Sequence, residues 1–429
     1  MGIIFMRAIL AALAAIGFSD AAFAEAVYVT AARAIDPGSG RVIDNAAVIV
    51  SDGRIAAIGA RTSTPAPAGA EAIDLGARTL MPGLIDMHTH LSGPATKGRG
   101  YDGLQYAGER NVVWGVVHAR KTLDAGFTTV RNVGSGGYDM LAVRDAINEG
   151  EIPGPRMFVA GPPIGIVGGH CSDRNYLPHD AERVGEGVAT GPWEMREKVR
   201  RNVKFGVDLI KTCSTGGVFS KGTLLGAPQS TVEELEAIVD EAHMRGLKVA
   251  SHAHGTVGIK NAIRAGVDTI EHASFLDDEA IAMAKRAGVY LSMDIYNTEF
   301  TLAEGEALGV PEESLAKERE VGSVQRESFR KAVAAGAKVI FGTDAAIYPH
   351  GDNAKQFAVM VRFGMTPMQA MTAATDLAAE ALGRKDDLGC LRVGCAADMI
   401  AVGGDPRSDI TVLETVDFVM KAGDTAKRP

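Results

Sequence analysis

The chain has 429 residues, of which 46% are hydrophobic and 23% are charged. This size and composition predict two or three domains, or one barrel with attached segments, and exclude disordered and fibrous proteins. Lys and Arg total 44 against 53 Asp and Glu, a net charge of −9 without a block of like charges. We therefore expect no nucleic-acid partner.

The first 24 residues have the pattern of a secretory signal: Arg7, an apolar run over 8–18 and the small-residue site Ala22-Phe23-Ala24. We expect cleavage after Ala24 and export to the periplasm or the medium. A membrane anchor is the alternative, but the run is shorter than the ~20 apolar residues that a span needs. No later segment has the pattern of a membrane span.

The four cysteines, Cys171, Cys213, Cys390 and Cys395, lack the C-x-x-C spacing of a zinc ribbon or redox motif. An oxidising compartment permits a disulfide between Cys390 and Cys395, provided that their backbones lie within about 7 Å. Four free or buried thiols are the alternative.

The two ends of the chain are predicted to be rich in β-structure. Short β-rich runs at 26–30, 47–50 and 55–58 alternate with turn signals, and runs at 397–402 and 416–421 repeat the pattern. We expect residues 25–82 and 385–429 to form a small β-sandwich domain.

The middle of the chain, residues 83–384, repeats one unit in which a helix closes with Gly and a short apolar strand follows. The expected strands lie at 84–90, 128–133, 157–161, 207–213, 248–252, 269–272, 289–295 and 338–342. Strands alternating with helices over this length predict an α/β fold, a (β/α)8 TIM-like barrel. A doubly wound sheet is the alternative, but the first strand is not followed by a G-x-G-x-x-G turn.

Polar residues end five of these strands: His88 and His90; Lys211; His252 and His254; His272; and Asp344. Burying such a polar residue at a barrel mouth costs free energy unless the residue is paired or coordinated. Because polar residues end five strands in this way, the sequence predicts a metal centre. Lys211 must lose its proton to bind a metal, and a neutral amine can take up carbon dioxide to form a bridging carbamate.

The chain is similar to the binuclear branch of the amidohydrolase superfamily. The resemblance lies in the pair His88-x-His90 that follows Pro82-Gly83-Leu84-Ile85-Asp86, and in Lys211, His252, Glu271-His272 and Gly342-Thr343-Asp344. The tail motif Ala396-Ala397-Asp398-Met399 also resembles the closing segment of that family. The resemblance implies that His88 and His90 bind one ion, carbamylated Lys211 bridges, and His252 and His272 bind the second ion. It also implies that Asp344 contacts the first ion and shuttles the proton. The spacing leaves His254 as an alternative to His252.

Two divalent ions, for which zinc is expected and manganese or cobalt are alternatives, would activate a water for amide hydrolysis. The loop Gly168-Gly169-His170-Cys171 resembles that of Xaa-Pro dipeptidases, carboxypeptidases and ochratoxin-hydrolysing relatives, in which the histidine holds the carbonyl or the oxyanion. The candidates for binding the product carboxylate are Arg174, Lys221, His254, Tyr296 and Tyr348.

Ser230 stands where dipeptide-cleaving relatives often have an aromatic residue, which favours a bulkier acyl group. We therefore expect a carboxypeptidase-like enzyme for N-acyl or aminoacyl amino acids, with ochratoxin A, cleaved to ochratoxin alpha and L-phenylalanine, as a candidate substrate. A dipeptidase, a cyclic-amide hydrolase of the imidazolonepropionase type and a non-catalytic metal-binding barrel are the alternatives. The resemblance also implies a homo-oligomer such as an octamer.

Overall fold

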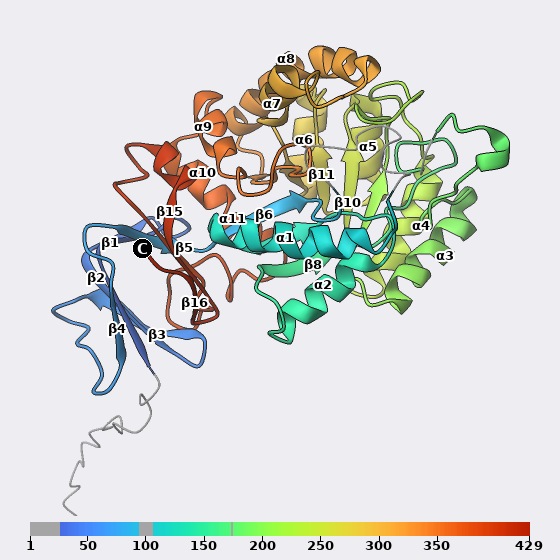
Figure 1. Cartoon of the computed structure of the whole chain (residues 1–429). Coiled ribbons are helices and arrows are strands. Elements are labelled where there is room, and N and C mark those ends of the chain that lie inside the picture. The colour runs from blue at the N-terminus through green and yellow to red at the C-terminus, as the bar shows by residue number, and fades with distance from the viewer. Residues whose placement is uncertain (1–25, 94–105, 173–174) are drawn as a thin grey trace, which may run out of the picture.

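The computed structural model describes residues 26–93, 106–172 and 175–429. It has two parts, a barrel surrounded by helices and a sheet that both ends of the chain build together (Figure 1). The predicted signal at 1–24 and Arg174 lie outside the described residues.

The terminal sheet contains eight strands in the order β16-β15-β14-β5-β1-β2-β3, with β4 also paired to β1. Its strands are β1 (Val27–Asp36), β2 (Arg41–Ser51), β3 (Arg54–Ala60), β4 (Glu71–Asp74), β5 (Thr79–Pro82), β14 (Met399–Val402), β15 (Val416–Lys421) and β16 (Asp424–Lys427). The junction between the two ends is the antiparallel pairing of β14 with β5. Both β-rich ends therefore contribute to one domain, as the sequence predicts.

The barrel contains all eight of the predicted strands. They are β6 (Leu84–Thr89), β7 (Phe127–Asn132), β8 (Arg156–Val159), β9 (Leu209–Cys213), β10 (Lys248–Ala253), β11 (Thr269–His272), β12 (Tyr290–Ser292) and β13 (Val339–Ile340). Parallel pairing joins β6-β7-β8 and β9-β10-β11-β12-β13. The barrel closes where the Met87 N–H donates to the Phe341 carbonyl (2.9 Å) and the Asp208 N–H donates to the Val159 carbonyl (2.8 Å).

Helices cover the outside of the barrel (Figure 1). They are α1 (Arg110–Asp124), α2 (Asp139–Asn148), α3 (Gly191–Lys204), α4 (Val232–His243), α5 (Thr256–Ala265), α6 (Asp278–Ala287), α7 (Asn297–Glu304), α8 (Glu312–Ala334), α9 (Lys355–Arg362), α10 (Pro367–Ala373) and α11 (Asp376–Ala381), with 3-10 turns η3 (His179–Ala181) and η4 (Ile410–Glu414). Gly266 and Gly288 end α5 and α6 with φ of 91° and 73°, a left-handed conformation that lets the chain turn at once into the next strand.

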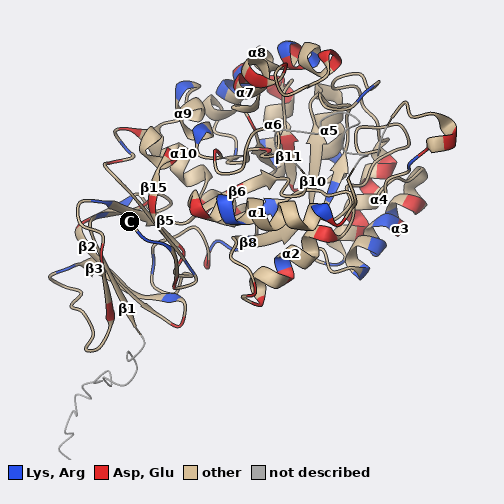
Figure 2. Ribbon diagram, viewed as in Figure 1, with Lys and Arg blue, Asp and Glu red and all other residues tan. Residues whose placement is uncertain are grey.

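Charges of both signs are spread over the outer helices, with no face of a single sign in this view (Figure 2). Within the described residues, no helix has both the length and the apolar character needed to cross a membrane.

All four cysteines are in disulfides, Cys171 with Cys213 and Cys390 with Cys395. The Cys390–Cys395 bridge is one that the sequence permits, whereas Cys171–Cys213 joins residues 42 positions apart that only the fold brings together. The alternative of four free thiols is therefore wrong for this structure.

Candidate metal centre

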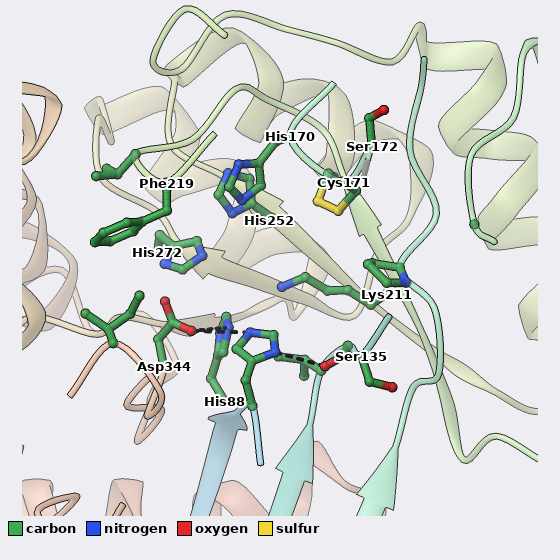
Figure 3. A pocket seen from close by; sticks show the side chains of 18 of the residues that line it. His88, Ser135, His170, Cys171, Ser172, Lys211, Phe219, His252, His272 and Asp344 are labelled. Atoms are coloured by element: carbon green, nitrogen blue, oxygen red, sulfur yellow. Dashed lines mark hydrogen bonds and ion pairs between the residues drawn. A yellow bond between two sulfur atoms is a disulfide. The ribbon is translucent and has the colours of Figure 1, made fainter. Parts of the chain in front are cut away.

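A cavity of about 910 Å³ opens at the carboxyl ends of the barrel strands and contains the predicted ligands (Figure 3). Its lining includes His88, His90, Lys211, His252, His254, His272 and Asp344, together with His170. Parallel strands in a closed barrel direct their carboxyl ends to one rim, so residues separated by up to 256 positions converge here.

His88, His90 and Asp344 form the first group of ligand atoms. Asp344 Oδ1 lies 3.4 Å from His88 Nε2 and 3.3 Å from His90 Nε2. The other ring nitrogens are engaged elsewhere, because His88 Nδ1 lies 2.8 Å from Glu271 Oε2 and His90 Nδ1 lies 3.0 Å from the Gly134 carbonyl. Each ring therefore has its Nε2 available on the side of the shared carboxylate, as metal coordination requires.

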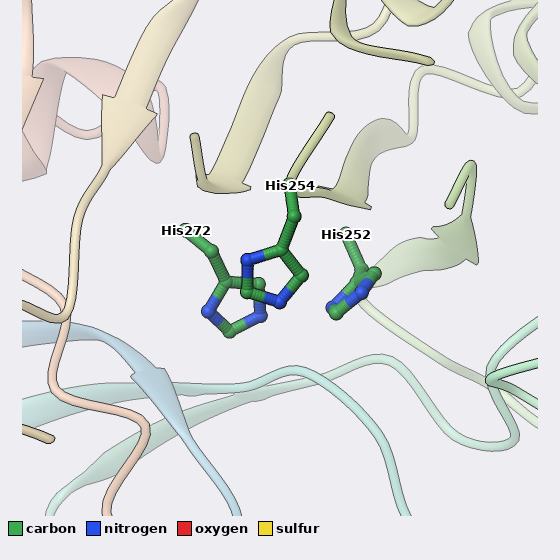
Figure 4. Close-up of side chains that lie close together, drawn as sticks. All are labelled: His252, His254 and His272. Atoms are coloured by element: carbon green, nitrogen blue, oxygen red, sulfur yellow. The ribbon is translucent and has the colours of Figure 1, made fainter. Parts of the chain in front are cut away.

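His252, His254 and His272 form the second group, with one nitrogen of each within 4.8 Å of the others (Figure 4). His272 Nδ1 lies 3.0 Å from Asp294 Oδ1, and His254 Nδ1 lies 2.7 Å from Ser274 Oγ. His252 is buried, and its Nε2 has no hydrogen-bond partner in the described part of the chain. An unsatisfied buried nitrogen beside two imidazoles fits a site for a cation.

Lys211 is only 4% exposed and lies between the two groups in the cavity (Figure 3). Burial lowers the pKa of Lys211 to about 8. A substantial neutral fraction is therefore available near pH 8, which is the form that reacts with carbon dioxide.

The surroundings of His88 and Asp344 determine their protonation states. Burial, together with Lys211, lowers the pKa of His88 to about 4, so the ring is neutral and can bind a metal. Burial favours a protonated Asp344, but His88 and His90 outweigh it and hold the pKa of this carboxyl well below its usual range. Asp344 is therefore ionised, and both Asp344 (φ 54°) and His272 (φ 69°) have left-handed backbones, a conformation that few non-glycine residues adopt.

Several supporting residues were not predicted from the sequence. Arg131 Nη2 donates to Glu271 Oε1 at 2.7 Å, so Glu271 connects Arg131 to His88. Asp86 accepts four hydrogen bonds, including those from the His88 N–H (3.1 Å) and the Thr343 hydroxyl (2.6 Å). The available signal for Arg131 and Asp86 was a charged residue within a predicted strand, next to apolar residues.

His170 enters the cavity from the loop after β8. Its ring stacks on that of His252 with centroids 4.0 Å apart, and its Nδ1 lies 2.8 Å from Ser220 Oγ. Burial lowers the pKa of His170 to about 3, which makes the ring neutral. The neighbouring Cys171 joins this loop to β9 through Cys213, close to Lys211 (Figure 3).

Three of the residues predicted to contact substrate do not line this cavity. Tyr348 is completely buried, and Tyr296 packs edge-on against it. Lys221 is exposed, with its Nζ 5.7 Å from the centroid of the Tyr176 ring. Ser230 is also buried outside the cavity lining, so its small side chain gives no room to an acyl group here.

A barrel that carries imidazole, carboxylate and lysine side chains at its rim is typical of one class of hydrolases. Residues 79–426 match the profile of the amidohydrolase family. The chain belongs to this family and is a hydrolase.

The chain is also similar to individual proteins over most of its length. Ochratoxinase from Aspergillus niger is 32% identical over 421 residues, covering 92% of this chain and 85% of the relative. A crystal structure of a Xaa-Pro dipeptidase with methionine bound in its active site has a TM-score of 0.88 at 38% identity, covering 94% of this chain and 99% of the other. The crystal structure of A. niger ochratoxinase has a TM-score of 0.84 at 31% identity, over 94% of this chain and 96% of that one.

Proposed function

We propose that the protein is a binuclear metal-dependent amidohydrolase that releases the C-terminal amino acid from aminoacyl or N-acyl compounds. The observation that carries the proposal is the convergence of six candidate ligands on one cavity: His88, His90, Lys211, His252, His272 and Asp344. The similarity to ochratoxinase and to a Xaa-Pro dipeptidase supports this substrate class.

The donor set fits two divalent ions, for which we propose zinc. His88, His90 and Asp344 would hold one, and His252 and His272 the other, with His254 close enough to replace or assist them. Lys211, after losing a proton and adding carbon dioxide through its Nζ, would carry the bridging carboxylate. The ions would supply an activated nucleophile near neutral pH and polarise the scissile carbonyl.

The residues of the chain would perform the remaining steps. Ionised Asp344 accepts the proton of the attacking water and returns it to the leaving nitrogen as the amide bond breaks. Neutral His170, which lines the same cavity, would donate a hydrogen bond to the carbonyl oxygen as negative charge develops on it. The buried Glu271 and Asp294 hold His88 and His272 in orientation through their Nδ1 atoms.

The substitution Lys211→Ala tests the metal centre. We expect amide hydrolysis to fall by at least about 100-fold and the bound metal to fall from two ions to one or none per chain, because the bridging ligand is lost. Elemental analysis and amino-acid release with and without chelator measure the two effects. Full activity with two bound ions in this variant would refute the assignment.

A substrate panel of Xaa-Pro, Xaa-Lys, Xaa-Phe and N-acyl-phenylalanine compounds, including ochratoxin A, defines the leaving group. Chelator-sensitive release of phenylalanine supports the proposed class. No release across the panel by protein that holds two ions would instead favour a cyclic-amide hydrolase, a class represented among the relatives by an imidazolonepropionase from Cutibacterium acnes at 26% identity.

We also propose that the chain is exported and assembles as a homo-oligomer, such as an octamer. The two disulfides support an oxidising compartment. N-terminal sequencing of the mature protein tests cleavage after Ala24, and light scattering tests assembly. A chain that retains Met1, or a monomer, would refute the corresponding proposal.

A further inference from the structure

One wall of the cavity is lined by helix α8 and the start of α7. Glu318, Val321 and Gln325 lie at positions i, i+3 and i+7 of α8, which places them on one face of the helix, and all three line the cavity. Asn297, the first residue of α7, and Asp294 line the same region. Neither Glu318 nor Asn297 belongs to the proposed ligand set.

Glu318 is a buried carboxyl group without an ionic partner. It is only 4% exposed, and its hydrogen-bond donor is the Thr298 hydroxyl, at 2.6 Å from Oε1. In the described part of the chain no basic side chain forms an ion pair with it; the nearby Arg326 pairs with Glu299 at 3.3 Å. Burial raises the pKa of Glu318 to about 7; the nearby Asp294 adds to the rise, whereas the Thr298 hydroxyl, His272 and Arg326 act in the opposite direction.

Asn297 supplies a second acceptor in the same cavity lining. Its Nδ2 donates to Asp294 Oδ2 at 2.5 Å, and its buried carbonyl oxygen, Oδ1, has no hydrogen-bond partner among the described residues. Asn297 precedes Thr298, the donor to Glu318, so the two acceptors lie on neighbouring parts of the wall. Asp294 is already engaged by His272, Gln325 and Asn297.

A buried carboxyl group with a single hydroxyl donor and an amide oxygen without a donor among the described residues are complementary to a cationic group with several N–H donors. The nearby Val321 and Ile347 complete an apolar lining that would exclude water and strengthen such a pair. A free carboxylate or a neutral acyl chain at this wall would leave these acceptors unpaired.

We infer that Glu318 and Asn297 bind the α-ammonium of an aminoacyl substrate, so that the enzyme favours compounds with a free amino terminus over N-acyl compounds. The inference rests on the proposed function and deepens it, because it selects dipeptide-type substrates within the proposed class. Glu318 and Asn297 are specificity-determining residues, distinct from the groups that handle the proton.

The test compares leucyl-phenylalanine with 4-methylpentanoyl-phenylalanine, which differs only in lacking the α-amino group. For the wild-type enzyme we expect kcat/KM to be at least about tenfold higher for leucyl-phenylalanine, as a charge-assisted hydrogen bond provides. Glu318→Gln is expected to reduce this preference to about twofold, mainly through a higher KM, since ground-state binding is lost. Glu320→Gln, on an exposed position of the same helix, removes the same charge and should keep the wild-type preference.

A third substrate, 6-aminohexanoyl-phenylalanine, places the ammonium at the end of the chain and distinguishes a terminal amine from an α-amine. Preference for this compound over leucyl-phenylalanine would overturn the α-ammonium assignment, and so would a wild-type enzyme without preference or an unchanged preference in Glu318→Gln. The wild-type comparison decides the question even if the variant does not fold. Release of phenylalanine from none of the three would overturn this inference, and only silence on the Xaa-Pro and Xaa-Lys compounds as well would overturn the proposed function.

Discussion

At the residue scale, the site depends on close approaches that leave no room for alternative side chains. Gly217 is the sharpest example, because a Cβ built there would lie 2.5 Å from His170 Cε1 and 2.9 Å from His252 Cε1. Real Cβ atoms do not tolerate such distances, so one of the two rings would have to shift. The absence of a side chain at this position therefore allows the two imidazoles to stack.

We predict that Gly217→Ala lowers kcat/KM by roughly 10- to 100-fold through displacement of the His170 ring, because a shift of about 1 Å in a reacting group has effects of this size. Gly136→Ala is the matched control, since Gly136 also lines the cavity and an added Cβ there meets no atom within 4 Å. Steady-state kinetics of both variants provide the measurement. Equal activity in the two variants would contradict the role of this close approach.

The buried carboxyl of Glu318 also makes the stability depend on pH. Its pKa is about 7 in the folded protein and 4.5 in a model peptide, so the folded state binds more protons between these values. This contribution to stability is fully present below pH 4.5 and is lost as the pH rises through 7. Gln resembles the protonated acid and cannot ionise.

We therefore predict that Glu318→Gln gains stability relative to wild type as the pH rises from 4.5 to 8, by at most roughly 3 kcal/mol. Denaturant unfolding midpoints at several pH values measure the difference, with the exposed Glu320→Gln as the control. A constant difference across this range would show that Glu318 has the same pKa in both states.

At the scale of elements, the two disulfides constrain segments of very different length. Cys171–Cys213 encloses 42 positions, and joins the His170 loop to the strand that carries Lys211, whereas Cys390–Cys395 encloses 5. The chain-entropy model attributes more stabilisation to the longer closed loop. Only the longer bridge contacts the cavity.

Replacing both cysteines of the 171–213 pair by Ala is expected to destabilise the fold by about 4 kcal/mol, against about 2 kcal/mol for the 390–395 pair. The first double variant should also lose activity at temperatures where it remains folded, since the His170 loop is released. Thermal unfolding and kinetics on both variants test this, and a larger loss from the 390–395 pair would contradict it.

At the scale of the whole molecule, the proposed ions would connect strands β6, β9, β10 and β11 and the segment after β13 across the barrel mouth. Ligands that bind only the folded state stabilise it by mass action. The metal centre would thus be part of the structural support of the barrel as well as the site of reaction.

Chelation should therefore lower the thermal midpoint of unfolding, with a free-energy loss of about 4 kcal/mol for an ion present at 1,000 times its Kd. Adding zinc back should restore the midpoint and the activity together. Scanning calorimetry with and without chelator makes the comparison. An unchanged midpoint in protein shown to have lost its metal would contradict this role.

The sequence by itself determined the eight strands, the shared terminal domain and the residues at the barrel rim. Apolar runs and Gly-terminated helices are local patterns, and parallel strands necessarily present their carboxyl ends together. The Cys171–Cys213 bridge, the Arg131–Glu271–His88 chain and the acceptor pair Glu318 and Asn297 depend on contacts between distant segments. Only the tertiary structure decided these contacts. It also shows that Lys221, Tyr296 and Tyr348 lie outside the cavity lining, because residue type does not specify the direction of a side chain on a loop or inside a core.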